Sequence, residues 1–312
     1  MDNKIKIVFW GTPKFAEDIL KRLLEESNLF EILAVVTAPD KPVGRKKILT
    51  PPPVKILALK NNILVLQPEK IVEEFKNKLF DIETDIFVVA AYGKILAQDV
   101  LNIPKYKSIN VHPSCLPKYR GASPIQSSLI SGDTETGISI ILMDDKMDHG
   151  PILVSKEHKI LDDDNYTSLA NKLADKSADL LIDILPKYIA GRVELVEQKH
   201  DESTFCKIIK KEDGLVDLDK MMAEEIYNRW RAFCVWPGVF FKTSLKGKET
   251  VVKLLEIEKN NLKTDGGTEV FYTKDKELYL VCGGETLLKI KKLQIEGKNP
   301  QSAAEFVNGY LK

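Results

Sequence analysis

An asparagine, a histidine and an aspartate are the residues of this chain whose types and spacing best suit a chemical reaction. Asn110 and His112 lie two residues apart in SINVHPSCLPKYRGASP, which begins at Ser108. Asp148 follows in MDDKMDHGP, which begins at Met143. An amide, an imidazole and a carboxylate can together bind an oxygen, polarise a carbonyl and move a proton. The transfer of a one-carbon acyl group to an amine requires those three abilities.

A β-strand would place Asn110 and His112 on the same face, because strand side chains alternate between faces. Pro113 would end that strand directly after the histidine. Residues 137–143 predict a second strand that leads to Asp148, and ligands of open α/β sheets bind beyond the carboxyl ends of strands. We therefore expect the three side chains to face one crevice. Residue types and spacing alone leave a structural role open, in which they tie down a loop, fill a core and cap a turn.

The first half of the chain predicts the frame that would hold these residues. Apolar runs typical of strands occur at residues 5–10, 30–37, 63–66, 85–91, 108–112 and 137–143. Helical patterns occur at residues 13–26, 54–60, 71–79 and 165–190. The near-continuous apolar run DIFVVAA is typical of a strand buried on both faces of a parallel sheet. The alternation predicts an open, parallel-rich α/β sheet.

The second half has a different pattern. A polar and charged stretch predicts a surface linker, and a short helix is expected at residues 223–233. Short strand-like runs separated by turn signals follow, at residues 251–257, 269–272, 278–281 and 287–293. Such runs predict a small β-barrel of the oligonucleotide-binding type. We therefore expect an α/β domain over residues 1–190, a linker over 191–206 and a barrel domain over 207–312.

Composition narrows the class of protein. The chain has 312 residues, of which 44% are hydrophobic and 29% charged, with a formal net charge of zero. No apolar run is long enough to span a bilayer, and the N-terminus does not have the pattern of a signal peptide. The four cysteines form no CxxC pair, which argues against a zinc knuckle or a disulfide framework. We expect a cytoplasmic protein.

Other kinds of site are less well supported by the sequence. A metal could in principle bind His112, Asp144, Asp145, Asp148 and His149, but no HxxxH or calcium-loop spacing supports it. Cys115 lies close to the histidine and could be a nucleophile, although neighbouring side chains at a strand end point apart. The first strand is followed by Gly11-Thr-Pro-Lys14 without the glycine pattern of a dinucleotide or nucleotide phosphate site.

A group of cations occupies the stretch PDKPVGRKKILTPPP, which begins at Pro39. Its members are Lys41, Arg45, Lys46 and Lys47. Cations on a loop stiffened by proline would suit a nucleic-acid backbone or an unpaired nucleic-acid end. A solvated surface loop is the alternative.

Several motifs together give the chain a resemblance to a known family. They are IVFWGTPKFA, APDKPVGRKKILTPPPVK, VVAAYGKIL, INVHPSCLPKYRGASPIQ, GDTETGISIILMDDKMDHG and RAFCVWPGVFF. The Asn-x-His…Asp pattern is common to enzymes that use 10-formyltetrahydrofolate, including glycinamide ribonucleotide and sugar N-formyltransferases. With the cationic loop, the LPxxRGAxPI run and the late RAFxxWPG motif, the chain resembles the methionyl-tRNA formyltransferase family essentially from end to end.

The resemblance implies an enzyme that transfers the formyl group of 10-formyltetrahydrofolate to the α-amine of methionine on initiator tRNA. By position, Asn110, His112 and Asp148 match the catalytic residues of that family. The implied fold is a Rossmann-like sheet of the formyltransferase type, followed by an oligonucleotide-binding-like barrel that provides a second tRNA surface. The resemblance implies no metal and no membrane, and we expect a monomer.

The resemblance also implies two sets of binding residues. For the folate co-substrate, these are the segment Ser114, Cys115, Leu116 and Pro117, and the pterin wall Val89, Ala91, Tyr92 and Ile95. For the tRNA acceptor end, they are Lys41, Arg45, Lys46 and Lys47, with Arg45 as the leading contact.

The chain departs from the family pattern at a few positions. His149 stands where the family usually has threonine. A role in tuning the pH response of the site is one interpretation, and we expect instead that its side chain points to solvent. Cys115 replaces a usual leucine, and Cys234-Val235 replaces Asn-Pro before Trp236. The nearest alternative function is formylation of an amino sugar or another small amine. A nucleic-acid-binding module with an inactive α/β domain is an alternative of another class.

Overall fold

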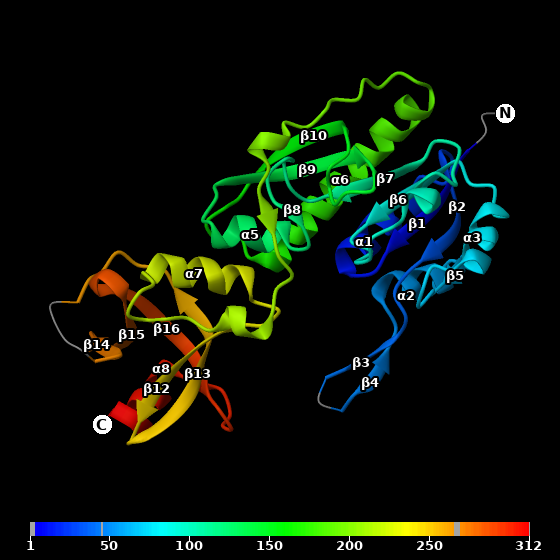
Figure 1. Cartoon of the computed structure of the whole chain (residues 1–312). Helices are drawn as coiled ribbons and strands as arrows, with labels where there is room; N and C mark the ends of the chain where they lie inside the picture. Colours follow the sequence, from blue (N-terminus) through cyan, green and yellow to red (C-terminus); the bar gives the residue numbers. More distant parts are fainter. Residues whose placement is uncertain (1–3, 45, 265–268, 312) are drawn as a thin grey trace. The chain divides into compact units, whose positions relative to one another are not determined.

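The computed structural model describes residues 4–44, 46–264 and 269–311 (Figure 1). The described residues form two compact units. The N-terminal unit comprises those of Met1–Pro124 together with Glu135–Ile160 and Ser168–Lys207. The C-terminal unit comprises those of Ile208–Lys312 together with Ile125–Thr134 and Leu161–Thr167.

A mixed sheet forms the centre of the N-terminal unit. Within the described residues its strand order is β10-β9-β7-β6-β1-β2-β5. The strands are β1 (Ile5–Gly11), β2 (Phe30–Val36), β5 (Leu64–Leu66), β6 (Ile86–Ala90), β7 (Ser108–His112), β9 (Glu135–Leu142) and β10 (Ile152–Lys159). The first five are parallel, whereas β9 is antiparallel to both β7 and β10. The predicted parallel-rich α/β sheet is confirmed, and β10 is an edge strand that the apolar runs did not indicate.

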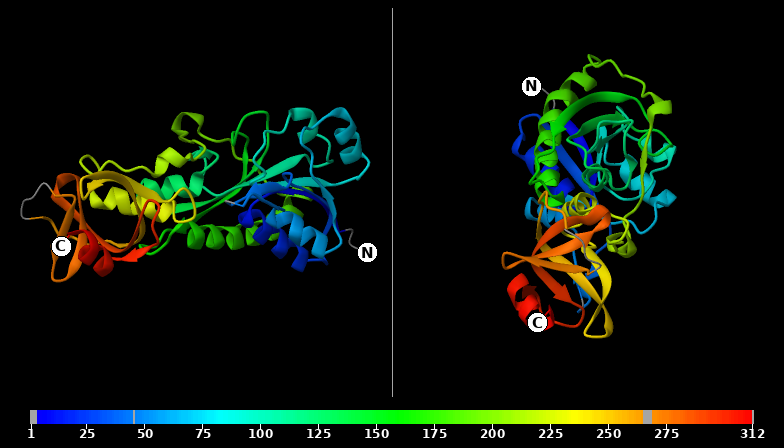
Figure 2. Two further views of the ribbon diagram at one scale, coloured as in Figure 1. Left: turned by 90° about the horizontal axis from the view of Figure 1, so that it is seen from below. Right: turned by 90° about the vertical axis from the view of Figure 1, so that its left-hand side faces the viewer.

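Helices cover both faces of this sheet. Helices α1 (Lys14–Glu25), α2 (Pro53–Lys60) and α6 (Tyr166–Ile189) lie on one side, and Figure 2 shows α6, in green, running along the strands. Arg22 of α1 reaches Asp179 of α6 at 3.1 Å. Helices α3 (Glu73–Phe80) and α4 (Gln98–Leu101) pack on the other side. No helix among the described residues combines the length and apolarity needed to cross a membrane.

An aromatic cluster fills the face beneath α3. The ring of Trp10, in β1, lies with its centroid 5.3 Å from Phe87 and 5.1 Å from Tyr92. Phe75 of α3 packs edge-on to the same indole at 6.3 Å. Burial of aromatic and aliphatic surface is the main stabilising contribution of such a cluster. The cluster packs against β1 and β6 near their carboxyl ends, next to the loop that follows β6.

An exposed hairpin projects from the N-terminal unit between β2 and α2. It consists of β3 (Lys41–Val43) and β4 (Ile48–Thr50), and Figure 1 shows it extending away from the sheet. At its base the Asp40 carboxylate accepts hydrogen bonds from Gln67 Nε2 and Lys55 Nζ, each at 2.8 Å. The hydrogen bond from Gln67 lowers the pKa of Asp40 most, and the hydrogen bond from Lys55 lowers it further. The hairpin is therefore tied to the unit at its base while its strands extend away from the sheet.

The C-terminal unit is built on an antiparallel sheet, as the strand-like runs predicted. Its described order is β12-β13-β16-β15-β14, with β17 paired to β16. The strands are β12 (Val239–Leu245), β13 (Lys248–Glu258), β14 (Phe271–Lys274), β15 (Glu277–Cys282), β16 (Thr286–Ile295) and β17 (Gln301–Ser302). Helices α7 (Ala223–Ala232) and α8 (Ala303–Phe306) accompany the sheet, and α5 (Pro124–Ile130) belongs to this unit from Ile125 onward.

Candidate active site

Strand pairing sets Asn110 and His112 opposite β9. Asn110 pairs with Ile141, and His112 pairs with Ser139. Just beyond β9, the Met143 N–H donates to the Ser108 carbonyl at 2.9 Å. The loop between β9 and β10 therefore begins beside β7 and returns Asp148 to the strand that carries the other two side chains. The alternation of β7 predicted one face for Asn110 and His112, and the position of Asp148 after the 137–143 strand predicted that it would face the same crevice.

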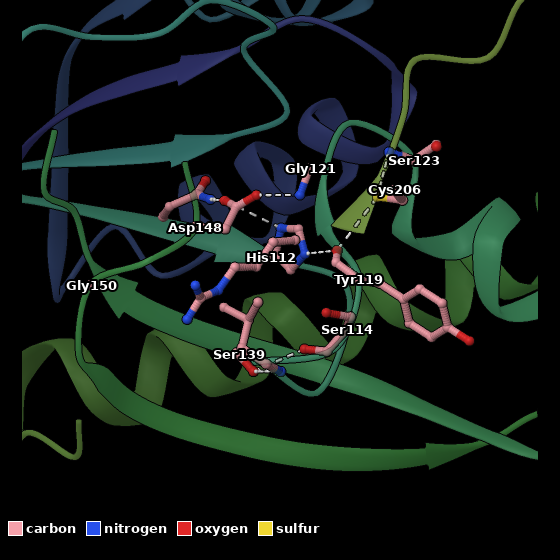
Figure 3. Close-up of polar contacts among 12 residues, drawn as sticks. His112, Ser114, Tyr119, Gly121, Ser123, Ser139, Asp148, Gly150 and Cys206 are labelled. Carbon is pink, nitrogen blue, oxygen red and sulfur yellow. Dashed lines mark hydrogen bonds and ion pairs between the residues drawn. The ribbon is translucent and has the colours of Figure 1, made fainter. Parts of the chain in front are cut away.

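Asp148 is the centre of the contacts among the three residues (Figure 3). Its Oδ1 accepts a hydrogen bond from Asn110 Nδ2 at 3.0 Å and lies 3.5 Å from His112 Nδ1. Its Oδ2 accepts a hydrogen bond from the Gly121 N–H at 2.7 Å. An amide has two N–H donors, so Asn110 retains a second one for another oxygen.

The imidazole of His112 has a fixed orientation. Its Nε2 lies 2.9 Å from the Tyr119 carbonyl oxygen, which can only accept, so Nε2 carries the proton of that hydrogen bond. The other ring nitrogen, Nδ1, faces Asp148. His112 is only 3% exposed, so the ring cannot turn away into solvent. Nδ1 is therefore the atom through which this histidine can exchange a proton with the carboxylate.

The backbone around Asp148 is unusual. Asp148 has a φ of 50°, in the left-handed region that aspartate adopts more readily than most residues. Two residues later, a Cβ on Gly150 would overlap the carbonyl oxygen of Leu142. A glycine at that position allows the loop to pass close to the end of β9. The left-handed turn and this close approach together aim the carboxylate at His112.

The residues that follow Tyr119 hold the other side of the carboxylate. Strand β8 (Arg120–Gly121) pairs in parallel with β11 (Phe205–Cys206). Gly121 has a φ of 119°, and a Cβ there would overlap the carbonyl oxygen of Cys206. Its N–H can therefore reach Asp148 only because the residue has no side chain.

Replacing Gly121 by alanine is expected to destabilise the protein by about 2–4 kcal/mol, from overpacking and from the left-handed backbone. Urea unfolding would measure the decrease. Gly44→Ala is the matched control, because Gly44 also has a positive φ, 72°, but no described atom beyond its two chain neighbours lies within 4 Å of the added Cβ. An equal decrease in both variants would show that the overlap with Cys206 costs nothing.

The folate segment predicted at residues 114–117 is held by a serine of β9. Ser139 Oγ accepts from the Leu116 N–H at 3.0 Å and donates to the Ser114 carbonyl at 2.9 Å. The Ser114 hydroxyl donates to the Lys118 carbonyl, so it is used within the loop. Leu116 is buried and Pro117 is half-buried. The segment leaves β7 directly after His112, so it borders the site with its backbone fixed.

The predicted pterin wall leaves the neighbouring strand, β6. Val89 and Tyr92 are buried, whereas Ala91 and Ile95 are exposed, Ile95 to 80%. Ala91 has a φ of 48°, so the chain turns sharply where β6 ends. Burial raises the pKa of Tyr92 to about 12, and its hydroxyl is a buried donor with no partner among the described atoms. Because β6 and β7 are adjacent and parallel, this wall and the folate segment border the same edge of the sheet.

The competing site interpretations find little support in the geometry. Cys115 Sγ donates to the Thr136 carbonyl at 3.4 Å, and burial raises the pKa of its thiol, which disfavours the thiolate that a nucleophile needs. Within the described part of the chain, no cluster of three or more His, Cys, Asp or Glu side chains could hold a metal ion.

Three of the predicted tRNA-binding cations lie on the exposed hairpin rather than beside Asp148. Lys41 begins β3, and Lys46 and Lys47 lie in the turn before β4. All three are exposed. Arg45, the fourth, lies outside the described residues.

His149 packs against another histidine instead of pointing freely to solvent. Its ring stacks on His200 with centroids 4.0 Å apart and planes 2° apart. Its Nδ1 lies 2.7 Å from Asp144 Oδ2. The expectation of a solvent-facing side chain was therefore wrong. His200 is far away in the sequence, so nothing local to His149 indicated the contact.

Gln198 and Arg120 are site residues that the sequence interpretation missed. Gln198 lies in the stretch predicted as a linker, yet it is buried and bonds to the backbone of Asp148 at 3.0 Å. Arg120 is buried beside it. An isolated glutamine in a charged stretch carries no pattern that indicates a site, so only the fold identifies it.

The comparisons with known proteins agree with this geometry. The formyl transferase family model matches residues 3–185, and the model of the formyl transferase C-terminal domain matches residues 208–311. The methionyl-tRNA formyltransferase of Caldicellulosiruptor saccharolyticus is 47% identical over 97% of this chain and 96% of its own. That of Sulfurihydrogenibium sp. is 40% identical over 98% of this chain and 97% of its own.

Solved structures resemble the fold. A sugar 3N-formyl transferase, WlaRD, solved with dTDP and 5-N-formyl-THF, gives a TM-score of 0.64 at 18% identity, over 95% of this chain and all of its own. HypX from Aquifex aeolicus in complex with tetrahydrofolic acid gives 0.65 at 14% identity, over 99% of this chain and 48% of its own. At these identities the likeness concerns the fold alone.

Proposed function

Because the chain belongs to the methionyl-tRNA formyltransferase family, we propose that it transfers the formyl group of 10-formyltetrahydrofolate to the α-amine of methionine on initiator tRNA. We assign the catalytic roles to Asn110, His112 and Asp148. The main support is that Asn110 and His112 both contact one carboxylate oxygen of Asp148. The full-length relatives favour this function over the formylation of an amino sugar.

Asn110 would bind the oxygen of the formyl group. When bound, 10-formyltetrahydrofolate supplies a formyl carbon attached to a nitrogen that can leave. The free N–H of Asn110 would donate to the formyl oxygen as the amine attacks that carbon and negative charge develops on the oxygen. A donor that is already held in place stabilises such charge at little reorganisation cost. The hydrogen bond from Asn110 to Asp148 holds the amide in that orientation.

His112 and Asp148 would manage the proton that the amine loses. An α-amine has a reference pKa of ~8, so a useful fraction is neutral near pH 7 and no strong base is required. On attack the nitrogen becomes positively charged and releases a proton, which Asp148 and Nδ1 of His112 can share. The leaving nitrogen needs a proton, and the same pair can return one. The 3.5 Å separation of the two groups is typical of a catalytic contact that tightens when substrates bind.

The donor would bind where β6 and β7 end. The segment after β7 supplies a fixed backbone, and the turn after β6 supplies the partly exposed wall from Val89 to Ile95. Open α/β sheets bind ligands beyond the carboxyl ends of their strands. The two segments border the same edge, with Asn110 between them, which supports this placement of the folate.

The acceptor end of the tRNA would contact the hairpin, and the C-terminal unit would provide a further tRNA surface. Residues 207–312 are only mildly basic, with 19 Lys and Arg against 16 Asp and Glu, and Lys289 among them is paired with Glu277 at 3.0 Å. Cations on the hairpin are exposed, so they are available to phosphates. We assign the reaction to the cytoplasm, where free cysteines such as the four of this chain are usual.

Removing cations of the segment from residue 41 to residue 47 should weaken the use of tRNA without affecting the use of the folate. In Lys46→Ala, Lys47→Ala and Arg45→Ala, we expect KM for methionyl-tRNA to rise and KM for 10-formyltetrahydrofolate to stay within about twofold. The binding constant for tRNA falls as the salt concentration rises. In a plot of its logarithm against the logarithm of the salt concentration, the loss of one cation that binds a phosphate should make the slope shallower by about one. Lys21→Ala, an exposed cation of α1, is the control. A rise confined to the folate KM would contradict the assignment.

The experiment that tests the function is transfer of labelled formyl from 10-formyltetrahydrofolate to methionyl initiator tRNA. Methionyl elongator tRNA and an amino sugar nucleotide are run alongside as competing acceptors. Strong preference for the initiator supports donor, acceptor and reaction together. Transfer to the sugar and to neither tRNA would overturn the proposal.

A further inference from the structure

Gln198 makes every hydrogen bond that its side chain can make. Its Nε2 donates to the Asp148 carbonyl at 3.0 Å and to the Gly150 carbonyl at 2.7 Å. Its Oε1 accepts from Arg120 Nε at 3.2 Å and Nη2 at 2.7 Å. An amide offers two donors and two acceptor sites, and all four are used. Gln198 is only 5% exposed, so solvent does not compete for them.

Arg120 determines which way the Gln198 amide points. A guanidinium only donates, so the oxygen of the amide must face Arg120 and its NH₂ group must face the two carbonyls. Arg120 is 3% exposed, and its Nη2 also donates to His200 Nδ1 at 2.8 Å. The planar guanidinium is thus held on two sides, and it holds the glutamine in turn.

The bonds of Gln198 and Gly121 restrain the same aspartate from two directions. Gly121, next to Arg120 in the chain, holds the carboxylate of Asp148 through its N–H. Gln198 holds the main chain of Asp148 and of Gly150, on both sides of His149. The backbone of Asp148 is in the left-handed region, which costs free energy and needs such support.

We propose that Gln198 is a positioning residue for the formyl transfer, which keeps the carboxylate of Asp148 in reach of Asn110 and His112 by clamping the Asp148–Gly150 turn. The inference rests on the proposed function, since it acts through Asp148. A displacement of about 1 Å at a reacting group can cost up to about 10²-fold in rate.

Gln198→Glu tests the clamp with little change of shape. A carboxylate still accepts from Arg120, but it presents an oxygen where the two carbonyls need a donor. We expect kcat to fall by about tenfold or more, up to about 10²-fold, with KM for both substrates nearly unchanged. Gln198→Asn, which keeps the amide on a shorter side chain, should give a smaller decrease of the same kind.

A double-mutant comparison separates positioning from general damage to the fold. If Gln198 acts through Asp148, the Asp148→Asn/Gln198→Glu variant should be no slower than Asp148→Asn alone. Hydrogen exchange in a peptide covering residues 144–151 should be faster in Gln198→Glu, whereas exchange in β2 should not change. This readout needs no activity and so applies to any variant that folds.

The outcomes that overturn the inference differ from those that overturn the proposed roles. Near-native kcat in Gln198→Glu, with a large decrease in Asp148→Asn, would overturn the positioning role alone. Decreases that multiply in the double variant would do the same, because they would make Gln198 independent of Asp148. Near-native kcat in Asp148→Asn would overturn both assignments together.

Discussion

Replacing Asp148 by asparagine is expected to lower kcat for formyl transfer by about 10²–10³-fold while the protein stays folded. The change keeps the size of the side chain and an oxygen that can accept the Gly121 N–H. It removes the negative charge opposite His112 Nδ1. With the oxygen of the new asparagine toward Gly121, its NH₂ group faces the Asn110 Nδ2 that donates to Asp148 in the wild type, so two donors meet. Proton transfer and the orientation of the asparagine donor are therefore both impaired.

The measurement is single-turnover formyl transfer with saturating 10-formyltetrahydrofolate, so that binding does not limit the rate. Asp145→Asn is the matched control, because Asp145 lies in the same loop and is exposed. We expect the control to be within about twofold of the wild type. Full activity in Asp148→Asn would remove the carboxylate from the chemistry, and an equal decrease in both variants would point to the loop as a whole.

The sequence predicts the elements of this site better than it predicts the contacts between them. The Asn-x-His spacing and the proline that follows suffice to place two side chains on one strand face. The apolar run of β6 suffices to indicate a buried parallel strand. Both signals are local, because they depend on the two-residue period of a strand and on burial of both faces.

Contacts between distant segments leave no comparable local signal. Strand β10 reads ILVSKEHK, with polar residues through most of its length, because an edge strand has one side free of neighbours. Gln198 lies in a charged stretch, and its role depends on Arg120, which is 78 residues away. The stacking of His149 on His200 is equally remote. From their composition such segments are predicted to be loops, although the stretch that carries Gln198 contacts the backbone of Asp148.

Glycines show how closely the fold constrains this site. Gly121 and Gly150 each lie where a Cβ would overlap a carbonyl oxygen, one on β11 and one at the end of β9. From the sequence alone, a glycine in RGA or DHGP predicts only a turn. In the structure Gly121 allows the segment that bonds to the Asp148 carboxylate to approach β11, and Gly150 allows the turn after Asp148 to approach the end of β9. The positions of the polar side chains and the absence of side chains beside them are therefore parts of one arrangement.

Replacing His112 is expected to have an effect of similar size, and two substitutions can separate its two ring nitrogens. A glutamine at position 112 can place an amide near the position of Nε2 and donate to the Tyr119 carbonyl, whereas an asparagine can place one near the position of Nδ1. Neither can carry a proton between the amine and Asp148. We expect kcat to fall by about 10²–10³-fold in both variants.

The two variants should differ in stability. His112→Gln keeps the bond to Tyr119 and should unfold close to the wild-type temperature. His112→Asn loses that bond and leaves the Tyr119 carbonyl with the weak thiol donor of Cys206 at 3.5 Å, so it should be less stable by about 0.5–1.5 kcal/mol. Thermal unfolding and single-turnover transfer on the same preparations test both expectations. A stable His112→Gln variant with near-native turnover would mean that the bond to Tyr119, and not the proton on Nδ1, is what the reaction needs. A stable and inactive variant would instead support proton transfer at Nδ1, since the glutamine keeps the donor to Tyr119 but has no nitrogen that can gain and lose a proton.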